Sequence, residues 1–237
     1  MNARRKSLHP SAALLAAVEA GDVTTIRSLL GTGIYPAVAY KNKLPVIEAF
    51  CSGQEALARP FLEAIREFSS PASTLNLNFL VSRVFADDRF SVSFAAEFAS
   101  DMRPELNSEG LTAQGLWGAL LEHGPETGHT GHPIVPRDPA TLAGKVRLAI
   151  RLGWRPEEAW HLGWLPHHSY VAAGFIEAAV MCVVAGFANP DEPLRREGLQ
   201  PPEIFEAWPA FQAALRAHRS NEVPFPFPST NRTRQRA

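Results

Sequence analysis

Apolar residues recur at intervals of three and four along most of this chain of 237 residues, a spacing that places them on one face of a helix. Alternation typical of a strand occurs only briefly, in residues 75–85, where the later apolar positions fit a helix equally well. The fold class expected is therefore all-α. The spacing predicts helices near residues 10–20, 22–31, 44–52, 60–68, 77–86, 89–101, 112–123, 138–152, 156–163, 168–187 and 202–218.

Local signals mark several helix ends. Asp22 and Asp138 stand where a carboxylate caps the helix that follows, and a proline comes directly after Asp138 at the first helical position. Gly33 and Gly153 follow apolar runs, where a helix commonly ends in a left-handed residue. The connections are short, so successive helices are expected to form antiparallel hairpins.

The helices are expected to form one domain over residues 9–220. A segment near residues 124–137 is too rich in glycine and proline for a helix, and it predicts an inserted loop. Flexible tails are expected at residues 1–8, which are basic and polar, and at residues 221–237, which repeat proline and arginine.

Composition excludes several classes of protein. A chain with 46% hydrophobic residues, 20% charged residues and a net charge of −1 is typical of a globular protein, not a disordered one. No apolar run reaches the roughly 20 residues of a membrane-spanning helix, and the near-zero charge argues against a nucleic-acid partner. Cys51 and Cys182 lie far apart in apolar stretches, which favours buried free thiols over a disulfide. We therefore expect a cytoplasmic protein, and its scarce lysine beside abundant alanine, arginine and proline indicates a bacterial one.

The first two hairpins are related by an offset of 32 residues, because residues 14–22 align with residues 46–54. Gly21 then matches Gly53, and the alanine four positions before each glycine coincides. A third unit at residues 79–98 follows loosely. A period near 33 with two helices per unit is the signature of an ankyrin array.

The first hairpin resembles an ankyrin repeat in its apolar and glycine positions, which are Leu14, Ala17, Gly21, Val23, Ile26, Leu29, Leu30 and Gly33. In the second, Leu44-Pro45-Val46-Ile47 stands where the family has Thr-Pro-Leu-His. The chain departs from the family because no Asp/Asn-rich β-turn follows Gly33, and because Pro60 falls inside the outer helix, which must restart or kink there. The resemblance implies an ankyrin-like solenoid of about five hairpins that binds another protein, without catalysis, through its concave inner-helix and turn surface.

Three of the five tryptophans lie within eleven residues in the C-terminal half. Trp154, Trp160 and Trp164 stand there beside Arg155 and His161, a composition typical of interface hot spots. Large rings are also commonly buried, so the same tryptophans fit a core where the last hairpins meet. These five residues are the candidate partner-binding site, with core packing as the alternative.

Histidines carry a second hypothesis, a metal site. His129 and His132 in the inserted loop, with His161 further on, offer three imidazoles for a zinc ion and leave a fourth position open. Their spacing matches no established zinc motif, and Glu158-x-x-His161 lacks the second such pair that a di-iron bundle needs. His167 and His168 belong to the same group of histidines in sequence.

Motifs for nucleophilic catalysis or phosphate binding are absent from the sequence. No cofactor is therefore expected. Glu97, Asp101 and Glu105, with the pair Asp87-Asp88 upstream, suggest an acidic patch on one hairpin, with an ordinary solvated helix face as the alternative. The main hypothesis is a protein-binding module, such as a bacterial inhibitor of immunity type or an adaptor, and the alternative is a metal-binding protein or enzyme that uses the histidines of residues 123–168.

Overall fold

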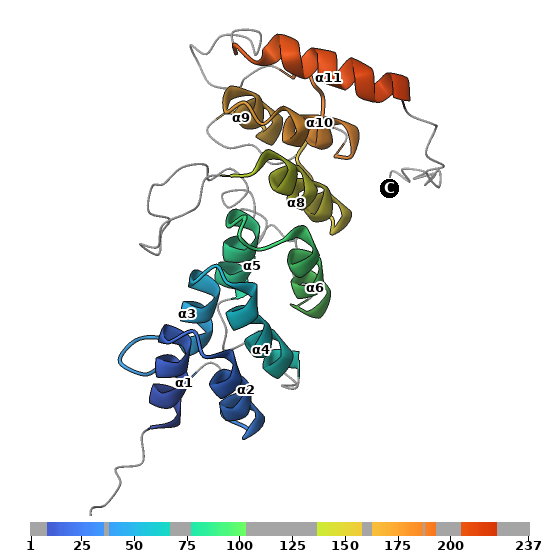
Figure 1. Ribbon diagram of the computed structural model, residues 1–237. Helices are drawn as coiled ribbons and strands as arrows, with labels where there is room; N and C mark the ends of the chain where they lie inside the picture. The colour runs from blue at the N-terminus through green and yellow to red at the C-terminus, as the bar shows by residue number, and fades with distance from the viewer. Residues whose placement is uncertain are drawn as a thin grey trace, which may run out of the picture.

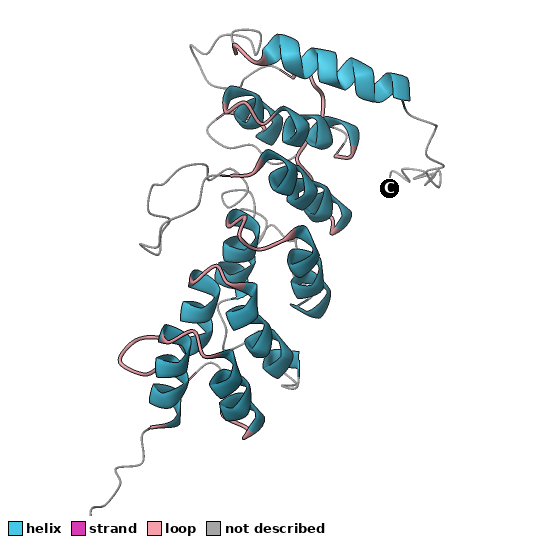
Figure 2. Ribbon diagram, in the orientation of Figure 1, coloured by secondary structure: helices cyan, strands magenta, loops and turns pink. Residues whose placement is uncertain are grey.

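The computed structural model describes residues 9–35, 38–66, 77–102, 137–157, 163–186, 188–192 and 205–221. These residues form ten helices and contain no β-strand, so the described part of the chain is all-α, as predicted (Figure 2). The helices follow one another along an elongated molecule, from α1 at one end to α11 at the other (Figure 1). Within the described helices, none combines the length and the apolar character that crossing a bilayer requires.

The first six helices contact one another in two rows. The odd-numbered helices α1, α3 and α5 touch in succession along one row, and α2, α4 and α6 touch along the other (Figure 1). Each odd-numbered helix also contacts the even-numbered helix that follows it. Their bounds are α1 Pro10–Glu19, α2 Val23–Gly31, α3 Pro45–Cys51, α4 Glu55–Arg66, α5 Leu77–Ala86 and α6 Val92–Met102.

The last four helices are joined to the two rows through α8, which contacts α6. Helix α10 then contacts α8, α9 and α11, and α9 also touches α11. Their bounds are α8 Pro139–Arg151, α9 Pro166–Ala172, α10 Ile176–Val184 and α11 Trp208–Asn221.

The helix ends predicted from local signals are confirmed. The carboxylate of Asp22 accepts a hydrogen bond from the backbone amide three residues on at 3.0 Å, and that of Asp138 does the same at 2.8 Å. Gly33 and Gly153 have φ values of +84° and +104°, the left-handed conformation that ends a helix. These features depend on a few neighbouring residues, which is why the sequence alone indicates them.

Helix α4 corrects the expected helix start at residue 60, and of the two alternatives at Pro60, a restart or a kink, the restart is wrong. The helix begins at Glu55 and runs through Pro60 to Arg66. Proline removes one backbone donor, the amide that would bond to the carbonyl of Ala56. Ala56 lies at the exposed surface, where water can satisfy that carbonyl, and Pro60 itself is buried. The packing of Pro60 therefore outweighs the lost hydrogen bond.

The single helix expected over residues 168–187 is two helices in the structure. Gly174 takes a φ of +80° between α9 and α10, and its amide donates to the carbonyl of Val171 at 3.0 Å. The amide of Phe175 donates to the carbonyl of Tyr170 at 2.8 Å. This pair of bonds is a Schellman motif, which ends α9 although the apolar pattern continues through the turn.

Two other helices begin later than expected from residues 89 and 202. Helix α6 begins at Val92, because the hydroxyl of Ser91 accepts the amide of Phe94 at 3.1 Å and caps the helix. Helix α11 begins at Trp208. Three predicted segments lie outside the described residues: the helix over residues 112–123, the middle of the helix over residues 156–163, and nearly all of the inserted loop.

Candidate functional site

The candidate partner-binding segment is divided between the core and the surface. Trp154 is buried with 3% of its surface exposed, which agrees with core packing, whereas Arg155 is exposed. Trp164 is half-buried, and its ring centroid lies 5.2 Å from that of Phe205. Trp160 and His161 lie outside the described residues. Arg155 and Trp164 are therefore the accessible part of this segment that the structure places.

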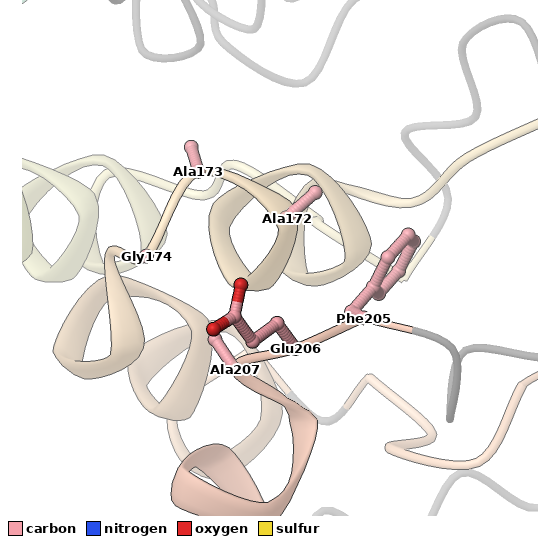
Figure 3. Close-up of a pocket in the computed structure, with 6 residues that line it drawn as sticks. All are labelled: Ala172, Ala173, Gly174, Phe205, Glu206 and Ala207. Carbon is pink, nitrogen blue, oxygen red and sulfur yellow. The ribbon is translucent and has the colours of Figure 1, made fainter.

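Phe205 also lines a hollow between the α9–α10 turn and the start of α11. The hollow has a volume of about 620 Å³ and is lined by Ala172, Ala173, Gly174, Phe205, Glu206 and Ala207 (Figure 3). Glu206 is the one ionisable side chain among these six residues, and it extends toward the α9–α10 turn (Figure 3). No sequence pattern indicated this hollow, because its two walls lie about 30 residues apart in the chain.

The two adjacent histidines of α9 belong to the core. His168 accepts the amide of Leu165 on Nδ1 at 3.0 Å, and its Nε2 lies 2.9 Å from the carbonyl of Glu192. Both rings are fully buried, and burial lowers the pKa of His167 to about 3 and that of His168 to about 4. His168 therefore uses both nitrogens structurally, to cap α9 and to join it to the segment at Glu192, and His167 packs in the core beside it with ring centroids 4.1 Å apart.

The three histidines proposed for a metal, His129, His132 and His161, lie outside the described residues. Among the residues that the structure does place, no three side chains of His, Cys, Asp or Glu lie close enough to hold a metal ion. Cys51 and Cys182 are both buried and unpaired, as predicted. Burial raises the pKa of the Cys51 thiol to about 11 and raises that of Cys182 further, so neither thiol is poised as a nucleophile.

Buried charged side chains connect the turn after α5 to the end of α3, and we call this cluster the first joint. Asp87 is fully buried and accepts hydrogen bonds from Arg83 at 2.9 Å and from Nε of Arg89 at 2.9 Å. Burial by itself raises the pKa of Asp87, but the hydrogen bonds from Arg89 and the positive charges of Arg83 and Arg89 together hold the pKa below its usual value. Arg83 also donates to the carbonyl of Cys51 at 3.0 Å, which ties this turn to the end of α3.

A second joint connects the same turn to α8. Asp88 accepts from Nε of Arg137 at 2.9 Å and from Nζ of Lys145 at 3.3 Å. Lys145 donates in addition to the carbonyl of Val84 at 2.9 Å, and Arg137 donates to that of Phe85 at 3.1 Å. Two cations thus satisfy carbonyl groups in the last turn of α5, where the helix dipole favours positive charge.

Lys145 was not singled out from the sequence as a residue that joins helices, although a lysine on the apolar face of a helix is itself a signal. It lies among Leu142, Val146 and Ala149 on the apolar side of α8, and its side chain is fully buried. Burial lowers the pKa of Lys145 to about 8, while Asp88 acts in the opposite direction. A lysine on an apolar helix face requires buried partners, but the identity of those partners depends on tertiary contact.

The acidic patch is wrong for Glu97, Asp87 and Asp88, whose charges are paired, while the side chains of Asp101 and Glu105 lie outside the described residues. Glu97 pairs with Arg59 and with Arg66 across neighbouring helices, and hydrogen bonding from Arg59 keeps its pKa below the usual range. Asp87 and Asp88 form ion pairs within the two buried joints. The partners of Asp88 and Glu97 lie more than 30 residues away in sequence, so the sequence pattern showed only the acidic half of those pairs, whereas Arg83 and Arg89 are close to Asp87 in the chain.

A tight turn projects between α2 and α3. The amide of Tyr40 donates to the carbonyl of Lys43 at 2.9 Å, and the amide of Lys43 donates back at 3.0 Å. Lys41 and Asn42 between them have φ values of +49° and +62°. We call this feature the Tyr40–Lys43 turn. Two consecutive left-handed residues are typical of a type I′ turn, so an asparagine-containing β-turn does follow Gly33, several residues later than the ankyrin pattern would place it.

Comparisons with protein-family models, with curated proteins and with solved structures find no match for this chain. Function must therefore be inferred from its own residues. Those that the structure describes offer an extended helical surface, a rigid projecting turn and a hollow with one carboxylate. Their buried ionisable groups are used in joints between helices or in the core.

Proposed function

We propose that this protein is a non-catalytic, ankyrin-like module that binds one partner protein, as an inhibitor of immunity type or as an adaptor in the cytoplasm. The two rows formed by α1–α6 support the proposal, because stacked helix pairs build an extended surface that suits a protein partner. The buried joints at Asp87 and Asp88 support it as well. They hold successive helix pairs in one arrangement, and a rigid scaffold is what such a surface requires.

The observation that carries the proposal is the preorganised Tyr40–Lys43 turn. Each of its two left-handed residues, Lys41 and Asn42, costs about 1 kcal/mol relative to an ordinary backbone conformation. Contacts around the turn offset that cost: the Tyr40 ring stacks on His9 with a centroid distance of 5.9 Å, and Lys43 pairs with Glu19 at 3.2 Å. A turn that is already ordered loses little entropy when it binds.

The surface beside this turn has the character of a protein interface. Val38 is 39% exposed and is the one exposed large hydrophobic residue in the described part of the chain. Tyr40 is half-buried and Lys41 lies 5.5 Å from the centre of its ring. An aromatic ring beside an exposed apolar side chain and a cation is typical of interface hot spots.

The segment with Arg155 and Trp164 is a second surface in the same proposal. Trp164 leaves part of its ring accessible while Phe205 supports it, and Arg155 is exposed nearby in sequence. Trp160 and His161 complete the segment in sequence. A partner that contacts the Tyr40–Lys43 turn and also reaches this segment would use both ends of the molecule.

The test is affinity capture of the tagged full chain from cells that produce it naturally, with metal analysis of the same eluate. We expect one stoichiometric partner, retained by the control variant Ser28→Ala on the exposed side of α2. Tyr40→Ala should weaken binding by about tenfold or more, the effect of losing an interface aromatic. If Trp164→Ala abolishes partner binding and Tyr40→Ala does not, the binding surface lies at residues 154–164. Capture of no stoichiometric protein, or about one equivalent of zinc or iron in the eluate, would contradict the proposal.

A further inference from the structure

We infer that the hollow between the α9–α10 turn and the start of α11 binds an arginine side chain of a partner protein. Its volume of about 620 Å³ falls within the range of roughly 300–1,000 Å³ that is usual for ligand sites. Five of its six lining residues are apolar or glycine, and the sixth is Glu206. The hollow thus presents one negative charge on an apolar floor.

The carboxylate of Glu206 selects a cation. It is exposed, and no ion pair or hydrogen bond joins it to another residue that the structure describes. Figure 3 shows its side chain directed toward the α9–α10 turn. Among the described residues, the carboxylates of Asp87, Asp88 and Glu97 are already paired with arginine or lysine. Glu206 leaves a position for a cation from outside the described part of the chain.

The end of α9 adds acceptors beside this carboxylate. The amides of the α9–α10 turn bond to earlier carbonyls, with Ala173 donating to Ser169 at 3.0 Å and Gly174 donating to Val171 at 3.0 Å. No amide among the described residues donates to the carbonyl of Ala172 or of Ala173, as is usual for the last carbonyls of a helix. A guanidinium group, with five donors and no acceptor, matches a hollow whose lining residues include one carboxylate and two residues with unused carbonyls.

The apolar lining distinguishes arginine from lysine. Phe205 lines the hollow, and its ring centroid lies 5.2 Å from that of Trp164 with the two rings tilted by 42°. A planar guanidinium stacks on an aromatic face while it bonds to a carboxylate, whereas a compact ammonium does not. Ala172 and Ala207 also line the hollow and offer apolar surface to the methylene stem of an arginine. The combination therefore favours arginine.

The inference rests on the proposed function only in taking the arginine from a partner protein. The hollow lies at the opposite end of the molecule from the Tyr40–Lys43 turn (Figure 1). Failure of capture with Tyr40→Ala and failure of arginine binding at Glu206 are therefore separate results. The arginines of this chain's own C-terminal segment, Arg232, Arg234 and Arg236, are the competing source.

The experiment is a titration of the isotope-labelled full chain with the peptide acetyl-Ala-Arg-Ala-amide, followed by backbone amide NMR signals. We expect saturable shifts at Ala172, Ala173, Gly174 and Ala207, with binding about tenfold weaker for the matched lysine peptide. The norleucine peptide should produce no shift. Glu206→Gln should abolish the arginine response, whereas Glu177→Gln, another exposed carboxylate in the first turn of α10, should preserve it.

Three results would overturn the inference. The first is the absence of shifts at the hollow, or equal shifts with the norleucine peptide. The second is an arginine response that persists in Glu206→Gln. The third uses the full chain with Arg232, Arg234 and Arg236 all changed to alanine. If the hollow's signals move in that variant before any peptide is added, the occupant is the chain's own C-terminal segment and not a partner.

Discussion

Replacing Asp88 with asparagine tests whether buried charges hold α5, α6 and α8 together. The Asp88 side chain is 4% exposed and faces Arg137 and Lys145, whose side chains are both 0% exposed. Asp88→Asn keeps the shape but removes the negative charge, so two buried cations lose their shared partner. Breaking a buried ion pair costs about 3–5 kcal/mol. Asp87 lies close enough to attract Lys145 as well, so we expect the free energy of unfolding to fall by about 3 kcal/mol.

Urea unfolding followed by circular dichroism measures this loss, and Glu97→Gln is the matched control. Glu97 and its partner Arg59 are each about a third exposed, so removing this charge should cost less than about 1 kcal/mol. A second variant combines Asp88→Asn with Lys145→Met and so removes one of the two buried cations left without their carboxylate. Its free energy of unfolding should exceed that of Asp88→Asn by about 1 kcal/mol or more. If Asp88→Asn costs no more than Glu97→Gln, the buried charges do not hold these helices together.

Three further predictions concern a glycine, a histidine and a cysteine. Gly53→Ala should lower the free energy of unfolding by about 2–3 kcal/mol, because a φ of +70° strains alanine and its β-carbon would lie within 2.2 Å of the Arg89 guanidinium. Gly33→Ala, with a φ of +84° and open space, should lose only the backbone part of about 1–2 kcal/mol; equal losses would contradict the role of the close approach. Burial holds the pKa of His168 at about 4, below the value of 6.5 expected when unfolded, so the unfolded chain binds more protons between these values. The contribution of neutral His168 to the free energy of unfolding is therefore fully present above about pH 6.5 and should be lost as the pH falls toward 4. The decrease in the free energy of unfolding should be smaller in His168→Gln. Urea midpoints of both proteins at about pH 7 and pH 5 check this. Burial raises the pKa of the Cys182 thiol, so it should react with a thiol reagent only in denaturant, and rapid reaction of the native protein would contradict its burial.

Residue type alone did not decide how the candidate site residues are used. Trp154 and Trp164 lie ten positions apart in one aromatic-rich segment, yet one is buried and the other half-buried. The difference depends on the distant residues that pack against each ring: the ring centroid of Phe205, about 40 residues further on, lies 5.2 Å from that of Trp164. Likewise, His168 looks like a potential ligand in sequence, but its two nitrogens are occupied by a helix cap and a distant carbonyl.

The sequence by itself determined the helical class and most helix ends in the described residues. Apolar spacing, the caps at Asp22 and Asp138 and the left-handed glycines act within about one helical turn, so neighbouring residues suffice to specify them. Only the tertiary structure decided that Asp88 meets Arg137 and Lys145, which lie 49 and 57 residues away. It alone decided that Pro60 continues a helix and that Glu206 faces a hollow. Such outcomes depend on the packing of distant segments and on their exclusion of water, and neither is encoded at any single position in the chain.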